Sequence, residues 1–467
     1  MCAPTTLLFL WCVCATSFGG ASGDVTKSSA PIVVQALNPT GLRISVPDSP
    51  GTDVVIINAN VNTPIVQRET GQVTGSVLEA RDGFWMLETK DITLKIGDVV
   101  FYWVYTAKGD KGERREGHQA IYELVEPSCR PSVTTYNNGR TACAGQLLLD
   151  ENFNSLNLSL WKHRIQFSDD PHLDFATYVD NPENSFVKDG KLHIKATVLN
   201  EDELLVPKKL EKCTWTRGGA EWCERNPKGW GILPPTRSAQ LTTRDNFSYK
   251  FGRLEIRAKA AVGDWLMSQL LLEPQAEVYG RAPAESGLLL ISKIRGNQNL
   301  VSPEGRLEGA SLSITQAHIA TCHRILFIFK ACELKGKKYS DEMHLYSVIW
   351  TPESLKIKLD DCEHEVKPPH GSFLKHGYFK DNCENSPWEK GTHLVPFDQE
   401  FYVSFKLIPG GFGLHHDVDI SPNGKPKSAI YSEGDPKAPL SFWRHKEIWL
   451  PTWTSDLEVD SVKVWAL

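Results

Sequence analysis

The sequence predicts an all-β protein with two domains. Its 467 residues exceed what one hydrophobic core usually supports. Short apolar runs alternate with turn residues along the chain, and the 35 Gly and 28 Pro are scattered as turn residues instead of being gathered in low-complexity tracts. The 14 Trp and a hydrophobic content of 41% agree with a β-rich globular protein.

Residues 31–126 are predicted to form an immunoglobulin-like β-sandwich. Turn signals such as NPTG at 38–41 and DSPG at 48–51 separate the short β-like runs IVVQAL, LRISV, DVVIINANV, FWMLET, DVVFYWVYTA and AIYELVE. About seven short strands in about 100 residues are typical of this fold. No cysteine lies in the segment, so the core disulfide of antibody domains is absent.

The N-terminal residues predict a secreted protein. An apolar core from Leu7 to Ala15, followed by small residues, is typical of a secretory signal, although no Lys or Arg precedes it. No later stretch reaches the 18 or so apolar residues of a membrane span. A net charge of −6 without long charged runs gives no reason to expect nucleic-acid binding. We therefore expect residues 1–23 to be removed and the mature protein to be extracellular.

Of the 11 cysteines, three fall in the predicted signal, and the other eight arrive in close pairs. In an oxidising compartment this spacing predicts four local disulfides, although eight cysteines allow many other connectivities. The predicted pairs are Cys129–Cys143, Cys213–Cys223, Cys322–Cys332 and Cys362–Cys383. No Cys/His spacing supports a zinc site, so we expect neither a metal nor a cofactor. Asn157 (NLS) and Asn246 (NFS) are predicted glycosylation acceptors.

The pieces GLRISVPDSPG, DGFWMLETKDITLKIGDVVFYWVY and YELVEP are spread along most of the first domain, whose bounds we place at 24–126. They resemble the β-glucan-binding module (carbohydrate-binding family 39) of insect β-1,3-glucan recognition proteins, also called Gram-negative bacteria-binding proteins. The resemblance implies that Trp85, Asp48, Arg81 and Asp82 engage the glucan. An exposed aromatic ring stacks on a pyranose while charged groups bond its hydroxyls. Trp85 could equally be a core residue, and Asp48 a turn residue.

Residues 146–467 carry a second series of motifs, which includes LLLDENFN, FGRLEIRAKAAVGDWL, DEMHLYSVIWTPE, PFDQEFYVSFKLIPGG and WLPTWTSDLEVDSVKVWAL. In this order they resemble family-16 glycoside hydrolases, the laminarinases and endo-β-1,3-glucanases. The resemblance implies a concanavalin-like jelly-roll β-sandwich with a long concave cleft. The intervening residues 127–145 are predicted to be a polar linker.

The stretch SGLLLISKIRGN at 286–297 stands where those enzymes read roughly S-G-E-I-D-I-M-E-x-R-G-N. The resemblance therefore places the nucleophile Glu on Leu288, the assisting Asp on Leu290 and the acid/base Glu on Lys293. Retaining hydrolysis needs two carboxyl groups about 5–5.5 Å apart, and neither Leu nor Lys can replace them. Positions 288 and 290 of a strand share one face, and a bulge is needed to bring position 293 onto it.

The departures extend beyond this stretch. Met267, Ser268 and Leu271 stand where Trp or Pro residues usually line the cleft, and the segment 318–340 looks like an insertion to which we assign no role. Another acid could have taken over the chemistry only by regaining a geometry tight to within about 0.5 Å. The candidates for such a relocated acid are Glu277, Glu285, Glu304 and Glu308.

The resemblance implies a non-enzymatic pattern-recognition protein of invertebrate innate immunity, present in haemolymph, that binds microbial β-1,3-glucan or a related polysaccharide. Recruitment of immune serine proteases or other recognition proteins also rests on the resemblance alone. Two alternatives stay open, a secreted endo-β-1,3-glucanase with a relocated acid and a recognition protein for lipopolysaccharide or peptidoglycan. An exposed Trp85 would favour glucan.

Overall fold

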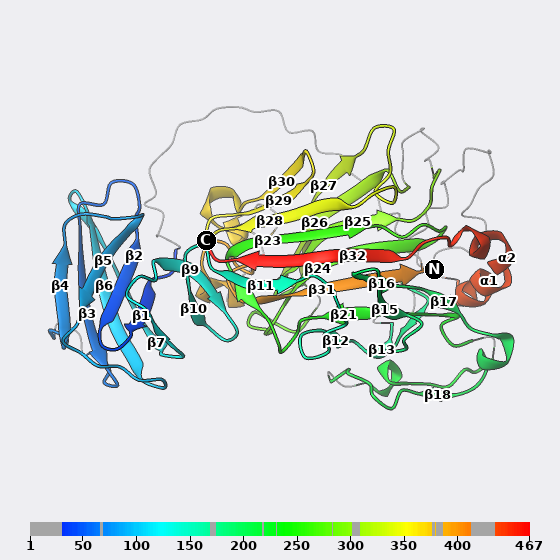
Figure 1. Ribbon diagram of the computed structural model, residues 1–467, viewed down its shortest axis with the longest axis horizontal. Coiled ribbons are helices and arrows are strands. Elements are labelled where there is room, and N and C mark those ends of the chain that lie inside the picture. The colour runs from blue at the N-terminus through cyan, green and yellow to red at the C-terminus, as the bar shows by residue number, and fades with distance from the viewer. Residues whose placement is uncertain are drawn as a thin grey trace, which may run out of the picture.

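The computed structural model describes residues 30–65, 69–168, 174–216, 219–229, 231–282, 284–300, 309–375, 379, 386–411 and 435–467. Its regular structure is almost entirely β, arranged in two bodies that lie side by side (Figure 1). This confirms the predicted all-β fold class. The predicted signal at 1–23 lies outside the described residues, and no helix within them is long and apolar enough to cross a membrane.

The N-terminal body is a sandwich of two four-stranded sheets, with strand orders β5-β2-β1-β8 and β4-β3-β6-β7. The inward residues of both sheets form one apolar core, in which Ile44, Ile57, Val100 and Val104 are inaccessible to solvent. The strands are β1 Val33–Leu37, β2 Leu42–Pro47, β3 Val54–Val61, β4 Val73–Val77, β5 Phe84–Thr89, β6 Val99–Lys108, β7 Lys111–Ala120 and β8 Leu124–Val125.

The second body packs a ten-stranded sheet against an eight-stranded sheet. The ten-stranded sheet contains β9 Pro131–Tyr136, β10 Arg140–Cys143, β12 Lys162–His163, β21 Gln240–Thr242, β22 Tyr249–Lys250, β24 Leu266–Pro274, β25 Leu288–Arg295, β26 Leu312–Thr321, β27 Arg324–Glu333 and β31 Phe401–Pro409. The eight-stranded sheet contains β11 Leu147–Glu151, β15 Ser185–Lys188, β16 Lys191–Ile194, β23 Gly252–Lys259, β28 His344–Trp350, β29 Leu355–Leu359, β30 Cys362–Val366 and β32 Leu457–Trp465.

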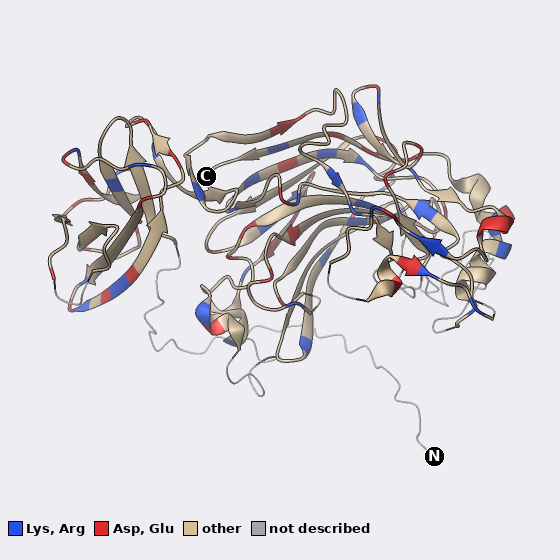
Figure 2. Cartoon of the chain, turned by 90° about the horizontal axis from the view of Figure 1, so that it is seen from below, with Lys and Arg blue, Asp and Glu red and all other residues tan. Residues whose placement is uncertain are grey.

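Short strands and two helices lie at the end of the second body that is farther from the N-terminal body (Figure 1). They are the strands β13 Gln166–Phe167, β14 Ala176–Tyr178, β17 Thr197–Val198, β18 Lys208–Lys209, β19 Glu224–Arg225 and β20 Thr236–Ser238, and the helices α1 Ala438–Arg444 and α2 Lys446–Trp449. Basic and acidic residues are interspersed over both bodies (Figure 2).

Alternation along single strands explains how the two large sheets enclose one core. In β23, GRLEIRAK, the residues Leu254, Ile256 and Ala258 are buried, while Arg253 and Arg257, which alternate with them, are exposed. The buried members join residues from both sheets in a single apolar cluster. The other face of the ten-stranded sheet, called the outer face below, points away from this core.

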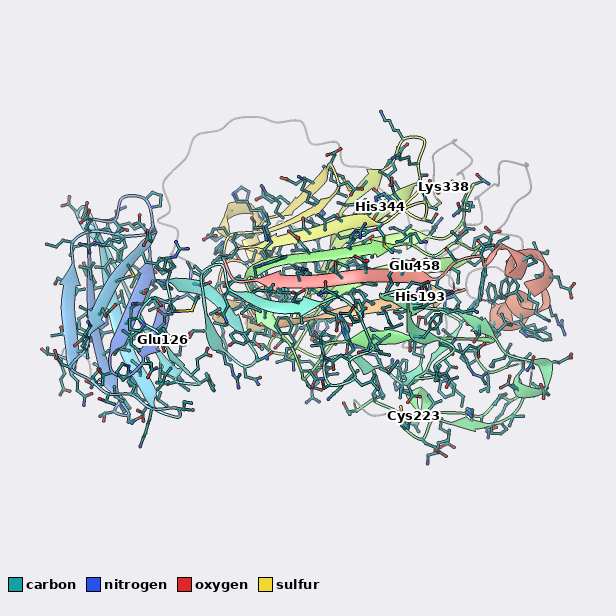
Figure 3. The ribbon with its side chains drawn as sticks, in the orientation of Figure 1. Glu126, His193, Cys223, Lys338, His344 and Glu458 are labelled. Carbon is teal, nitrogen blue, oxygen red and sulfur yellow. A yellow bond between two sulfur atoms is a disulfide. The ribbon has the colours of Figure 1, made fainter. Side chains whose placement is uncertain are left out.

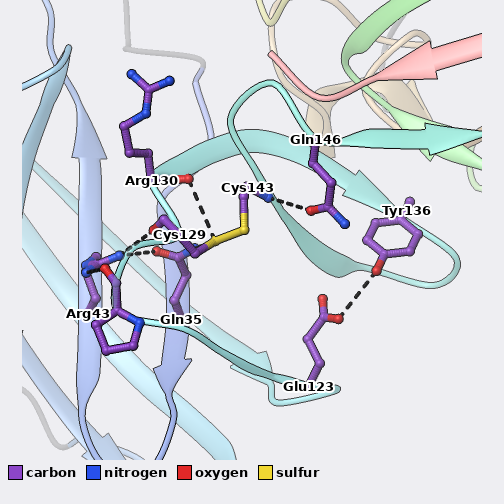
Figure 4. Close-up of a disulfide and its surroundings, with 9 residues drawn as sticks. Gln35, Arg43, Glu123, Cys129, Arg130, Tyr136, Cys143 and Gln146 are labelled. Atoms are coloured by element: carbon purple, nitrogen blue, oxygen red, sulfur yellow. Dashed lines mark hydrogen bonds between the residues drawn. A yellow bond between two sulfur atoms is a disulfide. The ribbon is translucent and has the colours of Figure 1, made fainter.

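The residues 127–145, predicted to be a polar linker, instead extend the ten-stranded sheet through β9 and β10, and β9 pairs with β22. The disulfide Cys129–Cys143 closes this segment beside the N-terminal body (Figure 4). The Arg43 guanidinium on β2 donates to the carbonyl oxygens of Cys129 at 2.6 Å and Pro127 at 2.7 Å. Residues 127–145 are therefore hydrogen-bonded to the N-terminal body through Arg43 and to the second body through the pairing of β9 with β22.

The structure contains the disulfides Cys129–Cys143 and Cys213–Cys223 (Cys223 in Figure 3), as the spacing predicts. The predicted pairs Cys322–Cys332 and Cys362–Cys383 are wrong, because Cys332 on β27 bonds to Cys362 on β30. β27 and β30 are the last strands of two facing sheets. Cys332 and Cys362 are therefore close in space although 30 residues separate them in sequence. Cys322 is also disulfide-bonded, and Cys383 lies outside the described residues.

Removing the Cys332–Cys362 bond by a double alanine substitution is expected to lower the free energy of unfolding by about 3–4 kcal/mol, because its sequence separation of 30 residues restricts the unfolded chain. Urea denaturation followed by fluorescence measures the change. The Cys213–Cys223 bond, with a separation of 10, is the comparison and should contribute about 1 kcal/mol less. A larger loss from the shorter loop would contradict this explanation.

The two predicted glycosylation acceptors differ in their surroundings. Asn157 is exposed, and its Oδ1 accepts hydrogen bonds from Ser159. Asn246 is half-buried, and its Nδ2, the atom to which a glycan would attach, donates to the Leu160 carbonyl at 3.1 Å. Glycosylation at either position stays a prediction, with Asn157 the better-placed acceptor in the folded chain.

Candidate functional site

The four residues implied to bind glucan gather at one corner of the N-terminal body, but their aromatic member is buried. Asp48, Arg81 and Asp82 are exposed, and the Asp48 amide donates to the Gly83 carbonyl at 2.8 Å. Trp85 is only 5% exposed, its ring packs in the core, and its Nε1 donates to Asp48 Oδ1 at 2.7 Å. Trp85 therefore lacks the open face that stacking on a sugar requires, and its role in glucan binding stays a prediction.

An outward-facing aromatic row, which the sequence did not reveal, lies on β6 of the same body. Val100 and Val104 point into the core, so the alternate residues Phe101, Trp103 and Tyr105 point to the opposite face of the sheet. Phe101 and Trp103 are half-buried, and Tyr105 is exposed. This row offers the flat apolar surface that Trp85 does not.

Charged residues on β7 flank the aromatic row. The register places Glu116 opposite Trp103 and His118 opposite Phe101. The Arg114 guanidinium lies 4.6 Å from the Trp103 ring centroid, and its Nε is 2.8 Å from the Glu116 carboxylate. The rings of Phe101 and His118 are 5.7 Å apart. Hydrogen-bonding groups therefore surround two aromatic faces.

These side chains line a cavity of about 290 Å³, which Pro64 and Ile65 also line. Trp103 Nε1 is buried at this site and has no hydrogen-bond partner among the described residues. A buried donor without a partner destabilises the free protein by about 1–3 kcal/mol, so a ligand hydroxyl that accepts from it would remove that penalty. The neighbouring Arg115 points the other way, and its guanidinium donates to the Ala30 carbonyl at 2.8 Å.

The chemistry of this face suits a saccharide. Aromatic rings pack against the apolar faces of pyranoses, and Arg, Glu and His side chains bond hydroxyl groups. The sequence did not reveal the row because every residue of VFYWVY is apolar or aromatic. Alternation of polar and apolar residues therefore cannot show which of them face outward. The useful signal was in the following strand, KGERREGHQA, whose polar character marks an exposed face beside the aromatic residues.

In the second body, Leu288, Leu290 and Lys293, the positions on which the resemblance places the three acids, lie on β25. Leu289 and Ile294 belong to the core, whereas Leu288, Leu290 and Lys293 point to the outer face. The register of β25 against β26 shifts between Leu290 and Lys293, and this is the bulge that the argument from alternation requires. The scaffold geometry is thus present, and the three positions carry no carboxylate.

Lys293 is poorly hydrated on this face. Burial and, to a smaller extent, the nearby charge of Arg295 lower the pKa of its ammonium to about 8. His318 on β26 lies opposite Leu288, and burial followed by the charge of Lys293 lowers its pKa to about 4. The histidine is therefore neutral at pH 7, and the charge that Lys293 adds to this part of the outer face is positive.

Of the acids considered for a relocated role, Glu277 forms an ion pair with Arg281 at 3.4 Å. Glu285 Oε2 accepts the Ala282 amide at 3.0 Å in the turn before β25. Glu304 and Glu308 lie outside the described residues. No pair of these acids is placed across the outer face within the part of the chain that the structure describes.

Glu273 on β24 is an acid that does lie on the outer face, where it is bound by other groups. Its carboxylate is 2.9 Å from Arg164 and accepts a hydrogen bond from Gln240 at 3.2 Å. Burial raises its pKa, but the charge of Arg164 and the surrounding hydrogen bonds outweigh this and hold the pKa below its ordinary value. Glu273 is therefore ionised at neutral pH, the wrong state for a general acid.

Comparison with known proteins places these features in a family. Residues 27–141 match the CBM39 family model, described as "Carbohydrate binding domain (family 32)". The β-1,3-glucan-binding protein of Tenebrio molitor is 30% identical over 99% of this chain and 99% of its own length. Gram-negative bacteria-binding protein 1 of Drosophila melanogaster is 29% identical over 95% of this chain and 97% of its own.

Among solved structures, the laminarinase from Rhodothermus marinus aligns with 69% of this chain and 98% of its own, at 18% identity and a TM-score of 0.43. The full-length similarity to the Tenebrio protein is the stronger finding, because it spans both bodies. The chain belongs to the family of insect β-1,3-glucan-binding and Gram-negative bacteria-binding proteins.

Proposed function

We propose that this chain is a secreted recognition protein that binds microbial β-1,3-glucan, or a related surface polysaccharide, through its N-terminal body. The observation that carries the proposal is the aromatic face of β6 and β7. There Phe101 and Trp103 lie beside Arg114, Glu116 and His118 at one cavity. The names of the relatives and the match to a carbohydrate-binding family model support it.

The chemistry of recognition follows from this arrangement. A glucan residue stacks on an aromatic ring, and its hydroxyls exchange hydrogen bonds with the charged side chains and with Trp103 Nε1. The exposed corner of Asp48, Arg81 and Asp82 stays a predicted second set of hydrogen-bonding groups. Binding to one short sugar is weak, and a polymer that presents repeated sites strengthens it.

The second body has no catalytic role in this proposal. Leu288, Leu290 and Lys293 occupy the positions of the three acids, and Glu273 on the same face is ionised and paired with Arg164. Acetal hydrolysis without a proton donor and a nucleophile does not proceed at a useful rate. The proposal also includes recruitment of immune serine proteases or other recognition proteins to the occupied cell wall, which rests on the family resemblance alone.

Co-sedimentation of the full chain with insoluble β-1,3-glucan, lipopolysaccharide aggregates and peptidoglycan tests the function, with laminarin hydrolysis assayed in parallel. We expect the chain to pellet with glucan and to release no reducing sugar above the buffer control. If the chain pelleted only with lipopolysaccharide or only with peptidoglycan, that polymer and not glucan would be the ligand. Sugar release that disappears in Glu273→Gln would establish a relocated catalytic acid and contradict the non-enzymatic assignment.

A further inference from the structure

The segment 318–340, to which sequence analysis assigns no role, forms most of the β26–β27 hairpin and exposes a row of apolar side chains. On β27 Leu326 and Ile328 pack against the core, so the alternate residues lie on the outer face. These are Ile325, Phe327 and Phe329, which are 45%, 49% and 64% exposed and are called the apolar strip below. Single exposed apolar residues are common on protein surfaces, but exposed apolar residues at three successive outward positions of one strand are not.

The apolar strip is continuous with the degenerate catalytic positions. Phe327 lies opposite His318 on β26, their rings 4.7 Å apart, and His318 lies opposite Leu288 on β25. In the adjacent row, Phe329 lies opposite Gln316, which lies opposite Leu290. Adjacent strands are about 4.8 Å apart, so the strip is about 10 Å from β25. One surface therefore runs across the outer face from β25 to the edge strand.

Lys293 adds a cation to this surface, and the charge of Arg295 lies nearby on the same strand. Its direct neighbours across the strands are neutral, Gln269 on β24 and Ile314 on β26. Within the described residues no carboxylate forms an ion pair with it. Two other cations of the same face are paired with carboxylates, because Arg164 lies 2.9 Å from Glu273 and Lys406 lies 2.9 Å from Asp174.

A poorly hydrated ammonium beside exposed aromatic rings favours a ligand with two chemically different ends. An anion next to Lys293 would restore the interactions that burial removes, and an alkyl chain over the apolar strip would displace water from Phe327 and Phe329. A neutral polysaccharide supplies neither an anion nor an alkyl chain. The surface is thus distinct in chemistry from the aromatic face of β6.

We propose that the outer face of β25, β26 and β27 binds a single anionic amphiphile. Its acyl chain lies along the apolar strip, and its phosphate or carboxylate head pairs with Lys293. This goes beyond polysaccharide recognition by the N-terminal body and gives the second body a ligand of its own.

Isothermal titration of the full chain with decyl phosphate below its micelle concentration tests the proposal. Decyl maltoside supplies the same chain with a neutral head, and inorganic phosphate supplies a head without a chain. We expect decyl phosphate to bind at least about tenfold more tightly than decyl maltoside, because a charge-assisted pair is lost. Inorganic phosphate should show no measurable binding.

Two variants locate the site. Lys293→Met should reduce decyl phosphate affinity about tenfold or more while leaving decyl maltoside unaffected, and Phe329→Ser should weaken both ligands. Phe329 is exposed, so its replacement leaves the core intact. The matched control is Ile448→Ser on α2, which removes an apolar residue of similar exposure, 65%, away from this face. Co-sedimentation with glucan should be the same in all three variants, which separates this test from that of the proposed function.

Several results would overturn the proposal. They are the absence of decyl phosphate binding, equal affinity for the neutral amphiphile, or an equal loss in the Ile448→Ser control. Binding to anionic vesicles alone would assign the surface to a membrane. Sedimentation velocity provides a further check, because dimers that Phe329→Ser abolishes, without any amphiphile binding, would assign the apolar strip to a second copy of the chain.

Discussion

Replacing Asp174 by alanine is expected to destabilise the second body by about 3–5 kcal/mol. Asp174 is buried, its carboxylate lies 2.9 Å from the Lys406 ammonium, and it accepts a hydrogen bond from the Tyr178 hydroxyl at 2.6 Å. Without the carboxylate, a largely buried cation loses its partner and cannot recover the hydration that it gave up on folding. Urea denaturation of the full chain, followed by tryptophan fluorescence, measures the loss.

The double variant Asp174→Ala, Lys406→Met is the matched control, because it removes both charges and should recover part of the stability lost in the single variant. A second comparison is Asp460→Ala, which breaks the surface pair with Arg257 and should change stability by less than about 1 kcal/mol. If the Asp174 and Asp460 variants proved equally mild, the buried pair would have no special role.

Replacing Trp103 by alanine is expected to weaken glucan binding about 30-fold, since a central aromatic contact typically contributes about 2 kcal/mol or more. The substitution also removes the Nε1 donor that has no partner in the free protein. Depletion of the protein from solution by increasing amounts of insoluble β-1,3-glucan measures the affinity. Trp103 points away from the core, so circular dichroism should show an unchanged fold.

Trp85→Phe is the control that distinguishes the two candidate surfaces of the N-terminal body. It keeps a buried ring but removes the donor to Asp48, so stability should fall by about 1–3 kcal/mol while glucan affinity stays within about twofold. The opposite pattern, in which Trp85→Phe loses affinity and Trp103→Ala does not, would move the site to the corner of Asp48, Arg81 and Asp82.

Much of the architecture could be predicted because apolar alternation is a local property. The stretch GRLEIRAK reads as a strand with one buried face, and β23 has that pattern. The bulge in β25 could also be anticipated, since residues 288 and 293 cannot share a face of a regular strand. Both inferences use the spacing of residues within one strand and require no knowledge of its neighbours.

The orientation of Trp85 and the pairing of Cys332 depend instead on contacts between distant segments. Trp85 is buried because the register sets it opposite Val46, which faces the core, and the run FWMLET does not reveal this. Cys332 meets Cys362 because two facing sheets end side by side. Neither register nor sheet packing follows from residue spacing alone, so the burial of Trp85 and the Cys332–Cys362 pairing could be found only in the folded chain.

The strands β9 and β10 determine how the protein can engage a surface that carries two kinds of ligand. Because Arg43 and the Cys129–Cys143 disulfide hold this connection, the span between the aromatic face of β6 and the outer face of β25 is a fixed length rather than the average reach of a tether. A flexible tether would tolerate many ligand spacings, each with a modest gain in avidity. With a fixed span, both surfaces can be occupied at once only where the two ligands are separated by that distance. The spacing of ligands on a microbial envelope, as well as their chemistry, would then determine which envelopes are bound tightly.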